Sequence, residues 1–254
     1  MEPADCNPNG HTFFLADLHL YSPAIIKHTK RTWALEGPAL EACLAGRPYE
    51  VNRDTAAWMN FLIVERINRR VGPDDRLVLV GDVVTANTAA QAYGRTVFLL
   101  ERLRCKNVHL VLGNHDCAVP NVGYAVTDAP QYRQDFRKAI SLPYRSVHDA
   151  CLFVCHGGIT VWASHYPHIT WPNASKTGLP GHASLSKTQS IHVYGHVHNS
   201  WMESPVSHPE RWCAVNVGTF GNENWPLRDD EISAMLAPQR KAMIAHILQG
   251  EDHA

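Results

Sequence analysis

The sequence predicts an α/β protein in which parallel strands alternate with helices. Three short apolar runs, at residues 11–16, 77–80 and 108–112, have the length and composition of buried strands. Helices are predicted between them, at residues 54–70 and 88–104. Crossovers of this length join parallel strands through right-handed connections. Each of these strands ends at polar residues that can bind a metal ion, and ligands of such sheets gather at that edge.

The first helix is expected to begin at Asp54, whose side chain can cap it. The segment before it, residues 21–54, contains several prolines and is expected to be an irregular insertion on the surface. Apolar residues recur at helical spacing within 54–70. Three aromatic residues of the two helices are predicted to lie in the core: Trp58, Phe61 and Phe98.

The second half of the chain has a different pattern. Two apolar runs, residues 151–155 and 159–164, are joined by His156-Gly157-Gly158, which indicates a hairpin. Two further strands are predicted at residues 191–194 and 213–217.

The chain is predicted to form a single domain over residues 1–254, because no repeat, low-complexity tract or linker divides it. Residues 1–10 are expected to be a flexible tail. Residues 167–190 are rich in Pro, Gly, Ser and Lys, and we expect them to form a loop over the site.

The composition argues for a globular cytoplasmic protein. Of 254 residues, 45% are hydrophobic and 19% charged, which excludes a disordered or collagen-like chain. The balance of 23 basic and 24 acidic residues indicates neither a nucleic-acid patch nor an affinity for anionic membranes. No signal peptide is evident, and no apolar run approaches the roughly 20 residues of a membrane span. The seven cysteines, without a Cys-x-x-Cys pair, indicate reduced thiols. The oligomeric state is not predicted.

Histidine is unusually frequent, at 16 of 254 residues, which points to metal or acid–base chemistry. Polar clusters follow the predicted strands: Asp17-Leu18-His19, Gly81-Asp82, Gly113-Asn114-His115-Asp116 and Gly195-His196-Val197-His198. Oxygen and imidazole donors mixed in this way suit Mn, Fe, Zn, Co or Ni. The ligands are too many for one tetrahedral ion and suit two ions that share a carboxylate.

These clusters, in this order, resemble the signature of the calcineurin-like binuclear metallophosphoesterases. The small bacterial and phage-type branch is the most similar, because Ser164-His165-Tyr166-Pro167 and Asn216-Val217-Gly218 also resemble its later motifs. The most specific parts are Gly-Asn-His-Asp and Gly-His-x-His, and the signature runs from residue 17 to 198. The resemblance implies a four-layer α/β/β/α sandwich of two mixed sheets, with a dimetal site at one edge.

The resemblance also implies two divalent ions, Mn²⁺ first, with Fe, Zn, Co or Ni as alternatives. One ion would be held by Asp17, His19, Asp82 and His198. The other would be held by Asp82, Asn114, His165 and His196. Two ions against two carboxylates leave a surplus of positive charge, which matches a bridging hydroxide and a phosphoryl group.

Further roles follow from the same resemblance. His115 would stabilise the transition state or protonate the leaving oxygen, and Asp116 would fix the tautomer of His115. Arg31 either contacts the phosphate, as an arginine of that branch does, or lies on the solvated surface. His156 is an alternative to His165 as a ligand. We favour His165 because it ends a predicted strand, whereas His156 belongs to a hairpin turn.

The expected activity is hydrolysis of a phosphomonoester or phosphodiester, on a small-molecule or phosphorylated substrate, with a metal-bridging hydroxide as nucleophile. A nuclease has no support, because the chain has no basic run. The alternative is a non-catalytic scaffold that keeps the fold and binds partner proteins. The presence of every ligand and of His115 argues against the scaffold.

Overall fold

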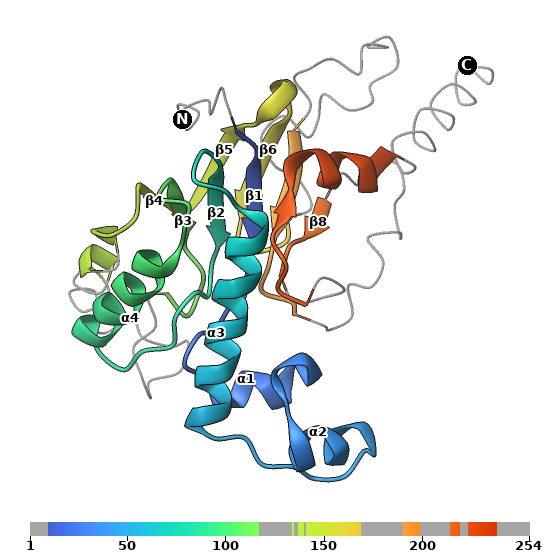
Figure 1. Cartoon of the computed structure of the whole chain (residues 1–254). Coiled ribbons are helices and arrows are strands. Elements are labelled where there is room, and N and C mark those ends of the chain that lie inside the picture. Colours follow the sequence, from blue (N-terminus) through green and yellow to red (C-terminus); the bar gives the residue numbers. More distant parts are fainter. Residues whose placement is uncertain are drawn as a thin grey trace.

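The computed structural model describes residues 10–116, 134, 137–139, 141–168, 190–198, 214–218 and 223–237. Two mixed sheets lie face to face within it (Figure 1). The first sheet has the order β4-β3-β2-β1-β9 and contains β1 (Thr12–Leu15), β2 (Arg76–Val80), β3 (Val108–Val111), β4 (Ser146–His148) and β9 (Leu227–Arg228). The second has the order β5-β6-β7-β8 and contains β5 (Ala150–Val154), β6 (Thr160–Ser164), β7 (Ser190–Tyr194) and β8 (Ala214–Asn216).

Strand direction follows the prediction. β1, β2 and β3 pair in parallel, and β5 and β6 form the expected antiparallel hairpin. β6, β7 and β8 are parallel, while β9 runs antiparallel to β1. Two mixed sheets with helices confirm the predicted α/β fold. The carboxyl ends of β1, β2 and β3 therefore lie at one edge of the molecule.

The core has two parts because the first sheet is buried on both faces. Phe14, Val78 and Val80 point toward the second sheet and pack with its residues, such as Phe153 and Val161. Alternate residues of the same strands, such as Leu15 and Leu77, pack against the helices. Burial on both sides explains why these strands are continuous apolar runs in the sequence.

The first long helix, α3 (Arg53–Arg70), begins at an earlier cap than predicted. The side-chain oxygen of Asn52 accepts hydrogen bonds from the backbone N–H groups of Asp54 and Thr55, both at 3.0 Å. The hydroxyl of Thr55 accepts from the N–H of Asn52 in return, which completes a capping box. Asp54 thus lies inside the first turn, and the predicted cap was wrong by two residues.

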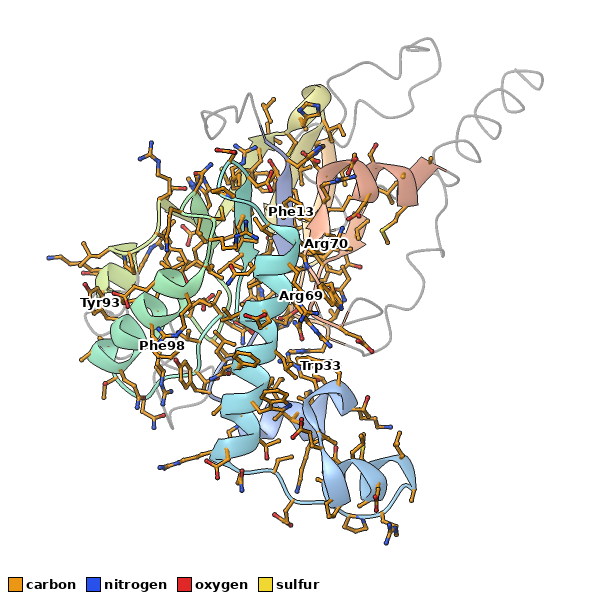
Figure 2. All side chains as sticks on the ribbon, in the orientation of Figure 1. Phe13, Trp33, Arg69, Arg70, Tyr93 and Phe98 are labelled. Atoms are coloured by element: carbon orange, nitrogen blue, oxygen red, sulfur yellow. The ribbon has the colours of Figure 1, made fainter. Side chains whose placement is uncertain are left out.

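The three aromatic residues predicted in the core are exposed instead. Trp58, Phe61 and Phe98 have 37%, 52% and 44% of their surface accessible. On α3, the buried stripe runs through Ala56, Met59, Ile63 and Ile67, and Phe61 lies on the opposite side of the helix. Trp58 and Phe61 stack on one another, with ring centroids 5.2 Å apart. Phe98 projects from α4 (Ala89–Arg102), and Arg102 lies over its ring (Figure 2).

The segment 21–54 is not irregular, contrary to the prediction. It forms α1 (Pro23–His28), the short 3-10 helix η1 (Thr32–Ala34) and α2 (Gly37–Leu44). Its prolines begin helices: Pro23 and Pro38 occupy first-turn positions, where the missing N–H is not needed. In Figure 1 these helices lie beyond the ends of β1 and β2, beside the start of α3.

Several predictions lie largely outside the described residues. These are the N-terminal tail, most of the loop at 167–190, and Cys213 of the last predicted strand. Residues 229–237 are helical. No helix that the structure describes has the length and apolar character needed to cross a membrane.

Candidate metal centre

The predicted ligands come together just beyond the carboxyl ends of five strands. β1 is followed by Asp17 and His19, β2 by Asp82, β3 by Asn114, β6 by His165, and β7 by His196 and His198. The carboxylate of Asp82 lies at the centre: its Oδ2 is 3.5 Å from Nε2 of His19 and 3.4 Å from Nε2 of His165. Parallel strand order in both sheets produces this convergence.

Two overlapping groups of side chains could each hold an ion. Asp17, His19 and His198 offer ligand atoms that lie within 4.8 Å of one another. Asp17, Asp82 and His165 form a similar group. The amide oxygen of Asn114 extends the second group, because it lies 3.1 Å from Nε2 of His165. It also lies 2.9 Å from Nδ1 of His196.

The backbone is strained at five of the seven candidate ligands. Positive φ angles occur at Asp17 (56°), His19 (46°), Asp82 (55°), His196 (69°) and His198 (48°). A non-glycine residue in this region costs on the order of 1–3 kcal/mol and persists only where the surroundings hold it. Such strain gathers at functional sites, and no sequence pattern reveals it.

Two glycines make room for the carboxylates. A Cβ atom at Gly113 would lie 2.3 Å from Oδ1 of Asp82, and one at Gly218 would lie 2.3 Å from Oδ2 of Asp17. Any side chain at either position would therefore displace a candidate ligand.

Burial controls the charge state of the cluster. It raises the pKa of Asp17 to about 7, an effect that the charge of His165 partly offsets. Burial lowers the pKa of His19 to about 3 and that of His198 to about 4. Burial also opposes ionisation of Asp82, but the hydrogen bond from His165 holds the pKa of Asp82 well below its ordinary value. His19 and His198 are consequently neutral at neutral pH, which is the form that coordinates a metal.

The residues fit divalent cations. Nε2 of His19 and Nδ1 of His198 are buried and have no hydrogen-bond partner among the described residues. A buried polar atom without a partner costs about 1–3 kcal/mol, which a coordinated ion would remove. The two buried carboxylates, Asp17 and Asp82, provide the negative charge that such an ion needs.

The structure brings His165, and not His156, to the cluster. Nδ1 of His165 donates to the carbonyl of Val80 at 2.9 Å, which directs Nε2 toward Asp82. His156 begins the hairpin turn η2 (His156–Gly158), and its ring lies 4.9 Å from the ring of His11. His11 in turn bonds Asp229, at the opposite ends of the strands.

Asp116 has a different position from the one predicted. Its buried carboxylate accepts hydrogen bonds from the backbone N–H groups of Asp82 (2.8 Å), Val83 (2.9 Å) and Gly113 (2.8 Å). In the part of the chain that the structure describes, it makes no hydrogen bond with His115. Asp116 therefore shapes the loop that carries Asp82, and the predicted tautomer contact is wrong.

Arg31 is buried, with only 1% of its surface exposed. Its guanidinium donates to the backbone carbonyls of Asp17 and Leu18. The alternative of a solvated surface is therefore wrong, and a phosphate contact stays a prediction. A buried arginine on local carbonyls has no signature in the sequence.

Exposed side chains lie beside the cluster of candidate ligands. The backbone N–H of His115 donates to Oδ1 of Asp82 at 2.8 Å, and its ring lies 5.0 Å from that of His19. Two neighbours were not predicted. The ring of Tyr166 lies 4.7 Å from that of His196, and exposed His28 lies 5.8 Å from His198. Tyr166 lies inside a recognised motif, whereas nothing in the sequence marks His28.

Comparison with known proteins agrees with this geometry. A family model described as calcineurin-like phosphoesterase matches residues 11–237. The chain belongs to the calcineurin-like phosphoesterase family. No curated protein matches it. Among solved structures, this chain is similar to the protein of unknown function AQ665 from Aquifex aeolicus, at 16% identity and a TM-score of 0.50. That match covers 89% of this chain and 100% of the other, and it concerns the fold alone.

Proposed function

We propose that this phosphoesterase hydrolyses a phosphomonoester or phosphodiester with two divalent ions, Mn²⁺ being the first choice. The observation that carries the proposal is the convergence of seven candidate ligands, Asp82 and six other oxygen and imidazole side chains, at one edge of the sheets. Buried, unpartnered nitrogens of His19 and His198 support it, because an ion would satisfy both. Bound ions would supply a hydroxide nucleophile and neutralise phosphoryl oxygens.

The protein's own residues hold and orient the reactants. Asp82 lies between the two ligand groups, where one carboxylate can serve both ions. His165 is fixed by its bond to Val80, so its Nε2 stays directed at Asp82 and Asn114. His115 is exposed beside His19, where its ring can donate a hydrogen bond to an oxygen of the substrate.

A matched pair of histidine variants tests this function. The substrates are bis(4-nitrophenyl) phosphate and 4-nitrophenyl phosphate, with Mn²⁺, Fe²⁺, Zn²⁺, Co²⁺ or Ni²⁺ added to chelator-treated protein. We expect metal-dependent turnover that His165→Ala abolishes. His156→Ala should retain it, because His156 lies on the hairpin turn beside His11. Turnover that survives His165→Ala, or needs no metal, contradicts the proposal. No turnover with any metal would favour the scaffold alternative.

We also propose a cytoplasmic location and a small-molecule or phosphorylated substrate. Among the described residues, Cys43, Cys105 and Cys155 are free thiols, which supports a reducing compartment. The net charge of −1 supports neither nucleic acid nor anionic membrane as a partner.

A further inference from the structure

Arg31 lies directly beneath the loop that carries Asp17 and His19. We propose that Arg31 is a positioning residue that sets the affinity of the ion held by Asp17, His19 and His198. The inference rests on the proposed metal-dependent function. In this role the arginine orients metal ligands and does not contact the substrate.

All three nitrogens of the Arg31 guanidinium donate hydrogen bonds. Nη2 donates to the carbonyl of Asp17, and Nη1 donates to the carbonyl of Leu18, at 2.6 and 2.8 Å. Nε donates to the hydroxyl of Thr29 at 3.1 Å, and that hydroxyl donates to the carbonyl of Ile25 at 2.7 Å. A planar fork that binds two adjacent carbonyls fixes their relative orientation, which a lysine ammonium does not.

These two carbonyls lie on the strained part of the chain. Asp17 and His19 have positive φ angles, so the backbone between them needs support from outside. The N–H groups are held by the neighbouring loop: those of Asp17 and His19 donate to the carbonyls of Gly81 and Asp82. Arg31 supports the loop from its carbonyl side. The direction of both ligand side chains follows from this paired restraint.

Arg76 provides a matched control. It is also 1% exposed, and it donates to the hydroxyl of Thr12 and to the carbonyl of Val154. These contacts tie the two sheets together where β1 and β2 begin, at the ends opposite the metal centre. Substitution of Arg76 by lysine also removes a buried guanidinium, but it leaves the contacts of the loop that carries Asp17 and His19 unchanged.

The test is calorimetric titration of chelator-treated protein with Mn²⁺, for wild type, Arg31→Lys, Thr29→Val and Arg76→Lys. We expect Arg31→Lys to weaken one of the two binding events by about 10- to 100-fold, the usual effect of losing a residue that orients a ligand. Thr29→Val should shift the same event less, because it removes the acceptor of Nε but leaves the two bonds from the guanidinium to the carbonyls of Asp17 and Leu18. Arg76→Lys should lower the melting temperature and leave both affinities unchanged.

Kinetics separate positioning from substrate contact. With Mn²⁺ at saturation, Arg31→Lys should keep the wild-type KM for bis(4-nitrophenyl) phosphate, because the guanidinium is buried and bonded to the carbonyls of Asp17 and Leu18. A raised KM under these conditions would indicate a phosphate contact and overturn the inference.

Other outcomes are also decisive. Wild-type affinities in Arg31→Lys, or equal losses in Arg31→Lys and Arg76→Lys, would contradict the positioning role. If Arg31→Lys does not fold, Thr29→Val decides, and unchanged affinity there overturns the inference. Wild-type protein that binds Mn²⁺ without hydrolysing any ester refutes the proposed activity alone. Wild-type protein that binds no metal refutes both.

Discussion

Asp82 lies close to both ligand groups, since its Oδ2 is 3.5 Å from Nε2 of His19 and 3.4 Å from Nε2 of His165. Asp82→Asn removes the charge that holds two cations together but keeps the side-chain volume. We therefore predict loss of at least one metal equivalent and of nearly all activity. Elemental analysis after gel filtration measures the first effect. Two equivalents of metal with wild-type turnover would rule out the shared carboxylate.

His115 lies beside the metal ligands without belonging to either predicted set. Its backbone, not its ring, is hydrogen-bonded to Asp82. We predict that His115→Ala keeps two metals and a normal melting temperature, while kcat falls by about 10²- to 10⁴-fold, or roughly 3–5.5 kcal/mol. The loss should be smaller for esters of 4-nitrophenol, because this leaving group needs little protonation.

A comparison of leaving groups checks the role of His115. Equal losses for good and poor leaving groups would indicate electrostatic stabilisation of the phosphoryl oxygens instead of acid catalysis. Loss of metal from His115→Ala would place this histidine among the ligands. The structure also permits that outcome, because His19, Asp82 and His115 offer ligand atoms within 4.8 Å of one another.

At the scale of elements, β6 and β7 are joined by a buried histidine that must stay neutral. Nδ1 of His192 donates to the carbonyl of Trp162, and Nε2 accepts the N–H of His168, both at 3.2 Å. Burial lowers the pKa of His192 to about 4, from an ordinary value of 6.5. The folded state therefore resists a proton that the unfolded chain accepts.

The sign of the pH effect follows from this difference. Above pH 6.5 neither state binds the proton, and the full contribution to stability is present. As pH falls from 6.5 toward 4, only the unfolded state is protonated, so stability is lost, by about 3 kcal/mol at most. His192→Gln lacks this titration. We measure the free energy of unfolding of both chelator-treated proteins by urea titration between pH 6.5 and 4. The difference between wild type and His192→Gln should shrink as pH falls. A constant difference would contradict a neutral, buried His192.

The elements differ in how well the sequence predicts them. Strands β1, β2 and β3 are predictable because burial on both faces makes them uniformly apolar. β9 has two residues and β4 has no fully buried position, so neither produces a pattern. The helices of the insertion were missed because prolines were interpreted as breaks, although two of them begin helices.

For the whole molecule, the ligand set is predictable because each ligand follows a strand and parallel strands end together. What the sequence does not contain is the environment of each residue. The burial of Arg31 and the contacts of Asp116 depend on loops that are remote in sequence. Positive φ angles at five ligands are likewise a property of the assembled edge.

The two ends of the strands have different tasks. Where β1 begins, buried Asp229 bonds the ring of His11 and the N–H of Thr12, and Arg76 joins the two sheets. These polar groups form hydrogen bonds at that end of the strands. At the opposite end, Nε2 of His19 and Nδ1 of His198 are buried and have no hydrogen-bond partner in the described part of the chain. Ion binding is therefore expected where polar groups are left unsatisfied.

The most direct test of a binuclear centre is anomalous diffraction at the manganese edge, from crystals of the wild-type protein grown with Mn²⁺. We expect two peaks about 3.5–4 Å apart, on either side of the Asp82 carboxylate. One peak should be next to His19 and His198, and the other next to His165 and His196. A single peak, no peak, or a peak only beside His11 and Asp229 would contradict a binuclear metal centre at Asp82.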